Sequence, residues 1–210
     1  MLTTLLLILI ALISYFLGSI NGAIIASNLI FHKDIRELGS GNAGLTNFLR
    51  NFGPGSVIIL LVIDVLKSVI SIVAGRLLLG IVGYGELGGF FAAFCLALGH
   101  SYPIYYGFRG GKGVLCTGIS IIVIDWKIAL ICLSVFALVI IFTRYVSLGS
   151  MLGALCLPIC VWAAGYGTMP GVLALMIWIL IVWKHRSNIA RIIAGTESKV
   201  KFGKKNKPTL

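Results

Sequence analysis

Long apolar runs, separated by short polar segments, dominate the hydrophobic pattern of this chain. A helix that crosses a bilayer needs roughly 17 to 25 mostly apolar residues, and the runs 2–31, 57–79 and 87–102 predict one such helix each. The run 145–183 is too long for one crossing and is interrupted by two glycines and a proline between residues 165 and 170, so it predicts two. The pattern is typical of an all-α, polytopic membrane protein.

The apolar stretch 114–143 fits either one helix or two short helices that turn at residues 125–127. The basic residues decide between the two, because cytoplasmic loops carry an excess of Lys and Arg. With the N-terminus outside, two helices place 14 of the 17 basic residues in the cytoplasm, whereas one helix would send the basic C-terminal segment outside. We therefore predict about seven transmembrane helices, with the N-terminus outside and the C-terminus cytoplasmic. The two halves of 114–143 are short for a bilayer core, so we expect them to be tilted or shielded.

Composition supports a lipid environment, since 59% of the 210 residues are hydrophobic and only 11% are charged, against roughly 25% charged in a soluble domain. The net charge of +11 would ordinarily suggest nucleic acid as a partner. Eight of the 17 basic residues lie from Lys184 onward, however, which suits an anionic membrane surface better. We expect one membrane domain, residues 1–198, and a basic cytoplasmic tail, residues 199–210. The five cysteines lie in apolar stretches, so we expect buried thiols, with no metal and no cofactor.

The first predicted cytoplasmic loop, residues 34–50, is rich in groups that bind phosphate. Glycines let backbone N–H groups converge on an anion because no Cβ blocks the approach, and an arginine adds a fixed fork of donors. Residues 39–44 also match G-x-G-x-x-G, but that dinucleotide motif requires a preceding β-strand, and here it lies between membrane helices. A flexible connector would explain the glycines of this loop but not its asparagine, hydroxyl and arginine side chains. The candidates are Gly39, Ser40, Gly41, Asn42, Gly44, Thr46, Asn47 and Arg50.

The second loop ends in Gly110-Gly111-Lys112-Gly113, at the entry to a predicted helix. Free amides, the helix dipole and an ammonium can together surround one phosphate there. The segment is not a Walker loop, because no glycine stands five residues before Gly111 and Gly113 replaces the Ser or Thr. A positively charged anchor with glycine hinges would produce a similar pattern.

Polar residues also follow the last predicted span. His185, Asn188 and Arg191 are spaced so that a helix would place them on one face, and both a structural and a functional histidine fit this position. The third cytoplasmic connection, residues 144–150, is short. Its serines, including Ser150, fit helix capping as well as function.

Asp64 and Lys67 lie within the second predicted span, at a spacing that permits an ion pair. Ionisable groups inside a membrane are functional candidates by default. A neutralising pair that braces the helices fits equally well, and we assign the two residues that structural role.

Taken together, these loops resemble the bacterial acyl-phosphate:glycerol-3-phosphate acyltransferase family (PlsY). Three family motifs occur in order, and the similarity extends over nearly the whole chain, with the segment after Glu197 the least constrained. The motifs are Gly39-Ser40-Gly41-Asn42-x-Gly44-x-Thr46-Asn47-x-x-Arg50, then Gly99-His100-x-x-Pro103 with Phe108-x-Gly110-Gly111-Lys112-Gly113, and last His185-x-x-Asn188-Ile189-x-Arg191-x-x-x-Gly195-x-Glu197.

The resemblance implies that a fatty acyl group passes in one step from an acyl phosphate to the 1-hydroxyl of glycerol 3-phosphate, giving lysophosphatidic acid and phosphate. It implies a multi-pass enzyme of phospholipid synthesis in the bacterial plasma membrane, with its active site at the cytoplasmic face. By the resemblance, Ser40, Lys112, His185 and Asn188 are the catalytic candidates, and Glu197 is a structural brace. Substrate binding falls to Gly39, Gly41, Asn42, Thr46, Asn47, Arg50, Gly110, Gly111, Gly113 and Ser150.

Two questions stay open at this point. The proton acceptor is either His185 or the substrate's own phosphate, and Ser40 would act as an acyl-enzyme nucleophile only with an adjacent base. A rival function is a transporter or exchanger for an organic phosphate, with Asp64 and Lys67 as coupling groups. That function predicts internal symmetry and binding groups near the midplane, whereas no repeat is evident and the candidate groups lie on one side.

Overall fold

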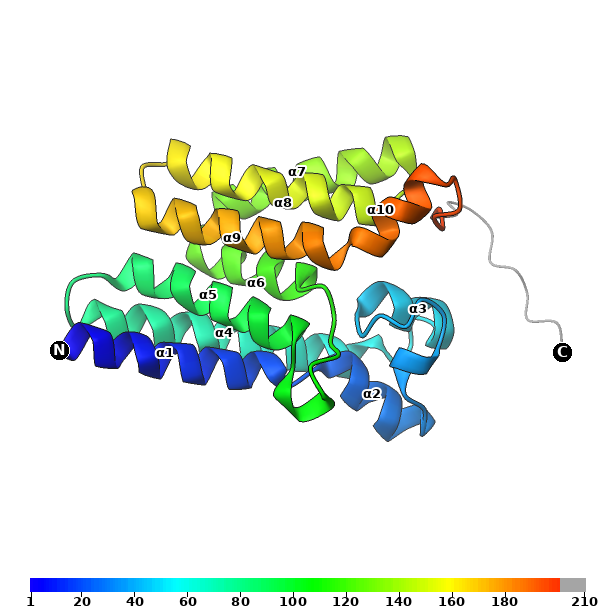
Figure 1. The fold of residues 1–210 in the computed structure, drawn as a ribbon, viewed down its shortest axis with the longest axis horizontal. Coiled ribbons are helices and arrows are strands. Elements are labelled where there is room, and N and C mark those ends of the chain that lie inside the picture. Colours follow the sequence, from blue (N-terminus) through cyan, green and yellow to red (C-terminus); the bar gives the residue numbers. More distant parts are fainter. Residues whose placement is uncertain (201–210) are drawn as a thin grey trace, which may run out of the picture.

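The computed structural model describes residues 1–200, and all regular structure in that range is helical (Figure 1). Two short 3-10 helices, η1 (Ile35–Glu37) and η2 (Ile104–Tyr106), lie in the loops. The α-helices are α1 (Leu2–Ser19), α2 (Gly22–Phe31), α3 (Leu45–Phe52), α4 (Val57–Gly80), α5 (Gly85–Ser101), α6 (Val114–Ile124), α7 (Trp126–Thr143), α8 (Val146–Ala163), α9 (Thr168–Lys184) and α10 (Arg186–Ile193).

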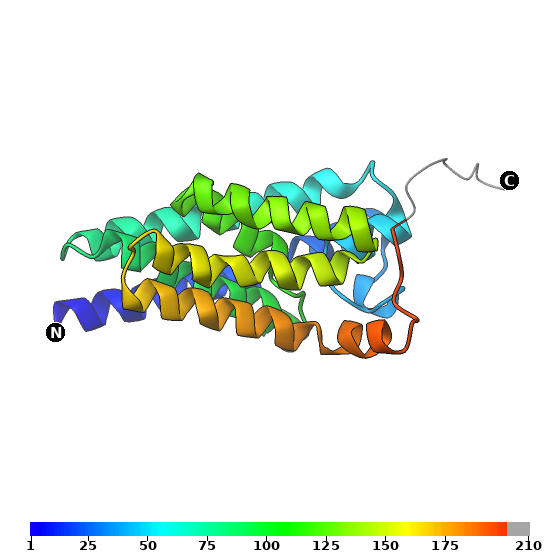
Figure 2. The same ribbon diagram turned by 90° about the horizontal axis from the view of Figure 1, so that it is seen from above.

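The helices form two packed groups that run roughly parallel to one long axis. One group contains α1, α4 and α5, the other contains α7, α8 and α9, and α6 lies between them (Figures 1 and 2). Glycines allow the first group to pack closely, because a Cβ on Gly18 or Gly99 would overlap the backbone of the facing helix, as would one on Gly75 or Gly88. Small residues serve the same purpose in membrane helix pairs generally.

Two interruptions of the apolar runs fall where polar residues can cap a new helix. Asp125 separates α6 from α7, and its Oδ1 accepts the N–H of Lys127 at 2.8 Å. The two helices run in opposite directions (Figure 1), so the prediction of a turn at residues 125–127 is confirmed. The first apolar run is likewise broken after Ser19, where the Asn21 side chain accepts the N–H groups of Ala23 and Ile24.

The interruption of the last apolar run comes from its glycines. Gly165 and Gly167 have positive φ angles of 76° and 93° and lie in the turn between α8 and α9, a backbone conformation that glycine adopts without strain. Pro170, by contrast, lies in the first turn of α9, where its missing N–H leaves no helical bond unmade.

By length and composition, five helices within residues 1–200 could cross a membrane, and a sixth if the bent pair α9–α10 counts as one span. The seventh predicted segment, α6, is an apolar helix of only 11 residues. The all-helical membrane architecture is therefore confirmed, whereas the count of seven spans and the orientation of the termini stay predictions.

The three polar segments meet at one end of the bundle. The loops that follow α2 and α5 lie there together with α3 and α10, opposite the end that holds Met1 (Figure 1). Val200 donates its N–H to the carbonyl of Arg144 at 2.8 Å, so the start of the predicted tail packs against the α7–α8 connection. Residues 201–210 of that tail lie outside the described residues.

Candidate active site

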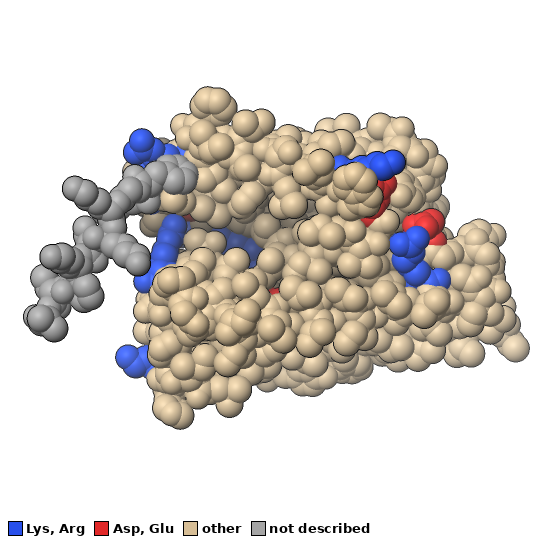
Figure 3. Space-filling model, turned by 180° about the vertical axis from the view of Figure 1, so that it is seen from behind, with Lys and Arg blue, Asp and Glu red and all other residues tan. Residues whose placement is uncertain are grey.

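A cavity of about 710 Å³ lies between the two helix groups and opens at the polar end. Figure 3 shows this hollow, with Lys and Arg side chains inside it and at its mouth. Its inner wall is apolar and comes mainly from α6, α7 and α8, including Gly118, Ile121, Phe136 and Leu157. Its outer part is polar and is lined by Ser40, Asn42, Thr46, Asn47, Arg50, Lys112, Ser147, Ser150, His185, Asn188, Arg191 and Glu197.

Lys112 and Glu197 are the ends of a hydrogen-bonded chain across the polar part. Lys112 Nζ donates to Asn188 Oδ1, and Asn188 Nδ2 donates to Glu197 Oε1 at 2.7 Å. Ser147 Oγ donates to the same carboxylate oxygen at 2.7 Å, and Arg191 Nε donates to Oε2 at 2.7 Å. The side chain of Glu197 therefore connects α8 and α10, and its role as a structural brace stays a prediction.

The charges of these two groups respond differently to their surroundings. Burial alone would raise the pKa of the Glu197 carboxyl, but hydrogen bonds from Ser147, Asn188 and Arg191 outweigh burial and lower it. Burial lowers the pKa of the Lys112 ammonium to about 8, with Arg191 acting in the same direction and Glu197 opposing it. A bound anion would stabilise the charged form of Lys112 further.

His185 is held at the junction of α9 and α10, which are bent by 55° relative to one another. The side chain is buried, and its Nδ1 lies 2.8 Å from the carbonyl oxygen of Ile181. Because a carbonyl can only accept, Nδ1 carries the proton and Nε2 of the neutral ring is left as an acceptor. Asn188 follows one turn later and faces the same cavity, as the spacing predicted.

The first loop brings Ser40, Thr46 and Arg50 to the cavity with exposed side chains. Asn47 plays a different part, since its Nδ2 donates to the carbonyls of Ile35 and Leu38 and its Oδ1 accepts the N–H of Ser40. Asn47 therefore shapes the loop instead of offering free donors to a ligand. Within residues 1–200, no hydrogen bond joins Ser40 Oγ to a histidine or carboxylate, so the structure gives Ser40 no activating base.

Three of the predicted phosphate-binding glycines do not line the cavity, namely Gly41, Gly110 and Gly111. A Cβ on Gly110 would overlap the His100 carbonyl, and one on Gly111 would overlap the His100 ring. The N–H of Gly111 already donates to that carbonyl at 3.1 Å, so it is not a free amide. These two glycines instead let the loop pack tightly on α5, while Gly39 and Gly113 do line the cavity.

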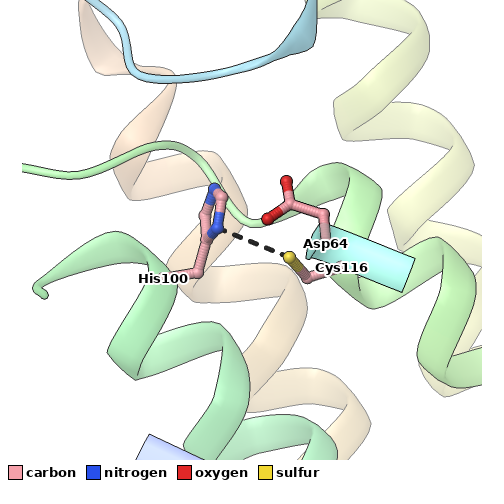
Figure 4. A group of neighbouring side chains, drawn as sticks. All are labelled: Asp64, His100 and Cys116. Atoms are coloured by element: carbon pink, nitrogen blue, oxygen red, sulfur yellow. Dashed lines mark hydrogen bonds between the residues drawn. The ribbon is translucent and has the colours of Figure 1, made fainter. Parts of the chain in front are cut away.

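Asp64, His100 and Cys116 place a carboxylate, an imidazole and a thiol close together beneath the polar part (Figure 4). Cys116 Sγ lies 3.4 Å from His100 Nδ1. Their arrangement is compatible with metal ligands, but the Lys67 ammonium lies among them, 2.7 Å from Asp64 Oδ1 and 3.1 Å from His100 Nδ1. The predicted Asp64–Lys67 pair thus exists, and its ammonium supplies the positive charge that a metal ion would otherwise bring. Sequence reasoning gave no role to His100 or Cys116, although the motif Gly99-His100 contained one of them.

Comparison with known proteins agrees with this geometry. The sequence model of the glycerol-3-phosphate acyltransferase family matches residues 8–195. Proteins named glycerol-3-phosphate acyltransferase from Clostridioides difficile (strain 630) and Halalkalibacterium halodurans are 39% and 42% identical, over 92% and 93% of this chain and 95% of each relative.

Solved structures agree as well. The crystal structure of PlsY, an integral membrane glycerol 3-phosphate acyltransferase, in its glycerol 3-phosphate form matches with a TM-score of 0.84 at 30% identity. That match covers 93% of this chain and 96% of PlsY, and the lysophosphatidic acid form gives a TM-score of 0.81 at 29% identity. The resemblance inferred from the three motifs is confirmed: the chain belongs to the glycerol-3-phosphate acyltransferase family.

Proposed function

We propose that this acyltransferase moves a fatty acyl group from an acyl phosphate to the 1-hydroxyl of glycerol 3-phosphate, giving lysophosphatidic acid and phosphate. The observation that carries the proposal is one continuous cavity, in which an apolar inner wall leads into a chamber lined by cationic and hydroxyl side chains. Both substrates are anions and one has a lipid tail, so each part of the cavity suits one part of the reactants. The solved relative was crystallised in glycerol 3-phosphate and lysophosphatidic acid forms, which supports the acceptor and the product.

The polar chamber supplies positive charge where the reaction develops negative charge. Lys112, Arg50 and Arg191 come from three separate segments and line the same space. The acceptor hydroxyl attacks the acyl carbonyl carbon, the bond from that carbon to the phosphate oxygen breaks, and inorganic phosphate leaves. An acyl phosphate is already a mixed anhydride, so the protein's main contribution is to orient the reactants and stabilise the charge.

We place the hydroxyl proton on the substrate's own phosphate, with His185 Nε2 accepting a hydrogen bond that orients the acceptor. His185→Gln should then lower kcat only about tenfold, because glutamine can still accept a hydrogen bond. Loss of a true general base would cost about 10² to 10⁴. Steady-state rates of the purified variant distinguish the two roles, and a drop in kcat beyond a hundredfold would make His185 the base.

The charge on Lys112 predicts how the reaction depends on pH. The pKa of Lys112 is about 8, so its side chain is positively charged below pH 8 and loses that charge as the pH rises through this value. We therefore expect kcat/KM to fall about tenfold per pH unit above pH 8, while both substrate phosphates stay ionised because their second pKa is about 6. In Lys112→Arg this decline should vanish up to pH 10, since a guanidinium does not titrate there. A flat wild-type profile from pH 7 to 10 would contradict the assignment.

The apolar wall predicts selection among acyl chains. Gly118 on α6 lines the cavity, and a Cβ added there meets no atom within 4 Å. Gly118→Leu should fill part of the groove without disturbing helix packing, and kcat/KM for palmitoyl phosphate should fall at least tenfold relative to octanoyl phosphate. Gly118→Ala should give a smaller change in the same direction. If the ratio for the two chain lengths stays constant across this series, the groove does not hold the acyl chain at α6.

We further propose that the protein lies in the bacterial plasma membrane with the polar end of the bundle in the cytoplasm and the N-terminus outside. The excess of basic residues near that end supports this orientation. The solved relative is an integral membrane protein, which supports the membrane location. Cysteine substitutions at Lys33 and Gly83, which lie in loops at opposite ends, should react from opposite sides of sealed vesicles with an impermeant thiol reagent. Equal labelling of both from one side would refute the orientation.

A transporter of organic phosphate fits the structure less well. The cationic side chains that line the cavity, Arg50, Lys112 and Arg191, come from the segments at the polar end of the bundle and not from its middle. Asp64 and Lys67 are buried and paired with each other, and Lys67 also bonds the carbonyls of Gly18 and Ile20, so neither is free to couple transport.

The deciding experiment offers purified protein in lipid either palmitoyl phosphate or palmitoyl-CoA, together with glycerol 3-phosphate. We expect equal amounts of lysophosphatidic acid and phosphate from the acyl phosphate, and no product from the thioester. Product from palmitoyl-CoA alone would overturn the donor, and no product from either would reopen the transport hypothesis, which flux measurements in vesicles would then test.

A further inference from the structure

Lys184, the last residue of α9, makes a long-range contact that none of the roles above explains. Its Nζ donates to the carbonyl oxygen of Ser101 at 2.8 Å and lies 4.4 Å from the ring centroid of Tyr102. Both partners belong to the C-terminal end of α5, where the last carbonyls of a helix lack internal partners and favour a cation. The next residue in the chain is His185.

This end of α5 also holds the loop that carries Lys112. The carbonyl of His100 accepts the N–H of Gly111, the carbonyl of Ser101 accepts Lys184, and the carbonyl of Tyr102 accepts the Tyr15 hydroxyl at 2.8 Å. Three consecutive carbonyls at the end of α5 therefore accept hydrogen bonds from the second loop, from the end of α9 and from α1. The side chains that must meet in the cavity, Lys112 and His185, come from two of these three elements.

We propose that Lys184 is a positioning residue for acyl transfer, which fixes the α9–α10 bend so that His185 and Asn188 face Lys112. The hydrogen bond between His185 and Ile181 lies within α9, so it orients the ring on its own helix but does not place that helix against the second loop. Lys184 makes the connection between the two. This inference rests on the proposed function.

An ordinary interfacial anchor is the competing explanation, because lysines near membrane helix ends often extend to the lipid headgroups. Arg186 provides the comparison, since it flanks His185 on the other side and is exposed. Its guanidinium lies 5.1 Å from the ring of Trp183 and donates to the Trp183 carbonyl, so both of these contacts stay within its own segment. Lys184 and Arg186 thus carry the same charge at the same interface, but only Lys184 bridges to α5.

The test compares Lys184→Met with Arg186→Met, each of which removes one positive charge next to His185 and keeps an apolar stem. We expect Lys184→Met to lower kcat about 10- to 100-fold with KM for both substrates changed less than about threefold, since misplacement by about 1 Å can cost a hundredfold. Arg186→Met should stay within about twofold of wild type. Lys184→Arg should recover most of the rate, because a guanidinium can both donate to Ser101 and stack on Tyr102.

A second pair of variants tests the same contact from the other side and guards against a misfolded lysine variant. Tyr102→Phe keeps the ring beneath the ammonium and should leave kcat unchanged, whereas Tyr102→Leu should lower it about three- to tenfold. Equal losses in Lys184→Met and Arg186→Met, a change confined to KM, or full kcat in Lys184→Met would each overturn the inference. If wild-type protein itself makes no lysophosphatidic acid, the proposed function fails first, and the wild-type control distinguishes that outcome.

Discussion

Lys112→Ala should lower kcat/KM about 10³-fold while the protein stays folded in the membrane. The side chain reaches the cavity from a loop, and its ammonium bonds Asn188, which in turn bonds Glu197. Removing it deletes one positive charge from the chamber in which the leaving phosphate develops its charge. Loss of a single preorganised donor to such a charge costs about 10² to 10³, and a charged donor is stronger than a neutral one.

Arg109→Ala is the matched control for this prediction, because Arg109 is a basic residue of the same loop, is exposed and does not line the cavity. Rates for both variants should be measured with palmitoyl phosphate and glycerol 3-phosphate in lipid. We expect the Arg109 variant to keep wild-type kcat/KM within about threefold. A Lys112→Ala enzyme that retains a tenth of wild-type activity would exclude Lys112 from the reaction chamber.

Much of this site could be predicted from sequence because charge and hydrophobicity act over long stretches of chain. The count of basic residues on each side indicated the turn at Asp125, and the structure separates α6 from α7 there. The same count predicted that three polar segments meet on one side, and they do. These features depend on residue type alone, so the pattern of charged and hydrophobic residues in the sequence is enough to predict them.

The parts that sequence could not supply depend on which atoms face one another. Glycine permits both a free amide for an anion and a close backbone contact, and the sequence does not distinguish the two uses. Gly111 takes the second, since its N–H bonds His100. Asn47 resembles a ligand donor in the motif, but its side-chain amide donates to carbonyls of its own loop. The contact between Lys184 and Ser101 joins residues 83 positions apart, beyond the reach of any local pattern.

The second large effect concerns stability. The Asp64 carboxylate is buried and is paired with Lys67. In Lys67→Met, the N–H of Gly22, 3.3 Å away, is the one present partner that this carboxylate keeps. The substitution also removes the ammonium that donates to the carbonyls of Gly18 and Ile20, which lie at the break between α1 and α2. Breaking a buried pair in this way typically costs about 3–5 kcal/mol. That corresponds to a Tm lower by roughly 10 °C for a chain of this size.

The double variant Asp64→Asn/Lys67→Met separates the cost of an unpaired charge from the cost of lost packing. Replacing both members of a buried pair is often close to neutral, so the double variant should recover more than half of the Tm lost in Lys67→Met.

Arg76→Met is the exposed comparison: it breaks the pair with Glu86, whose members are 37% and 48% exposed, and should cost only about 0–1 kcal/mol. Thermal unfolding of the three variants in one detergent measures all of these effects. If the double variant is no more stable than Lys67→Met, the destabilisation comes from the contacts of Lys67 with the α1–α2 break. The pair would then brace the bundle through its hydrogen bonds and not through its charge.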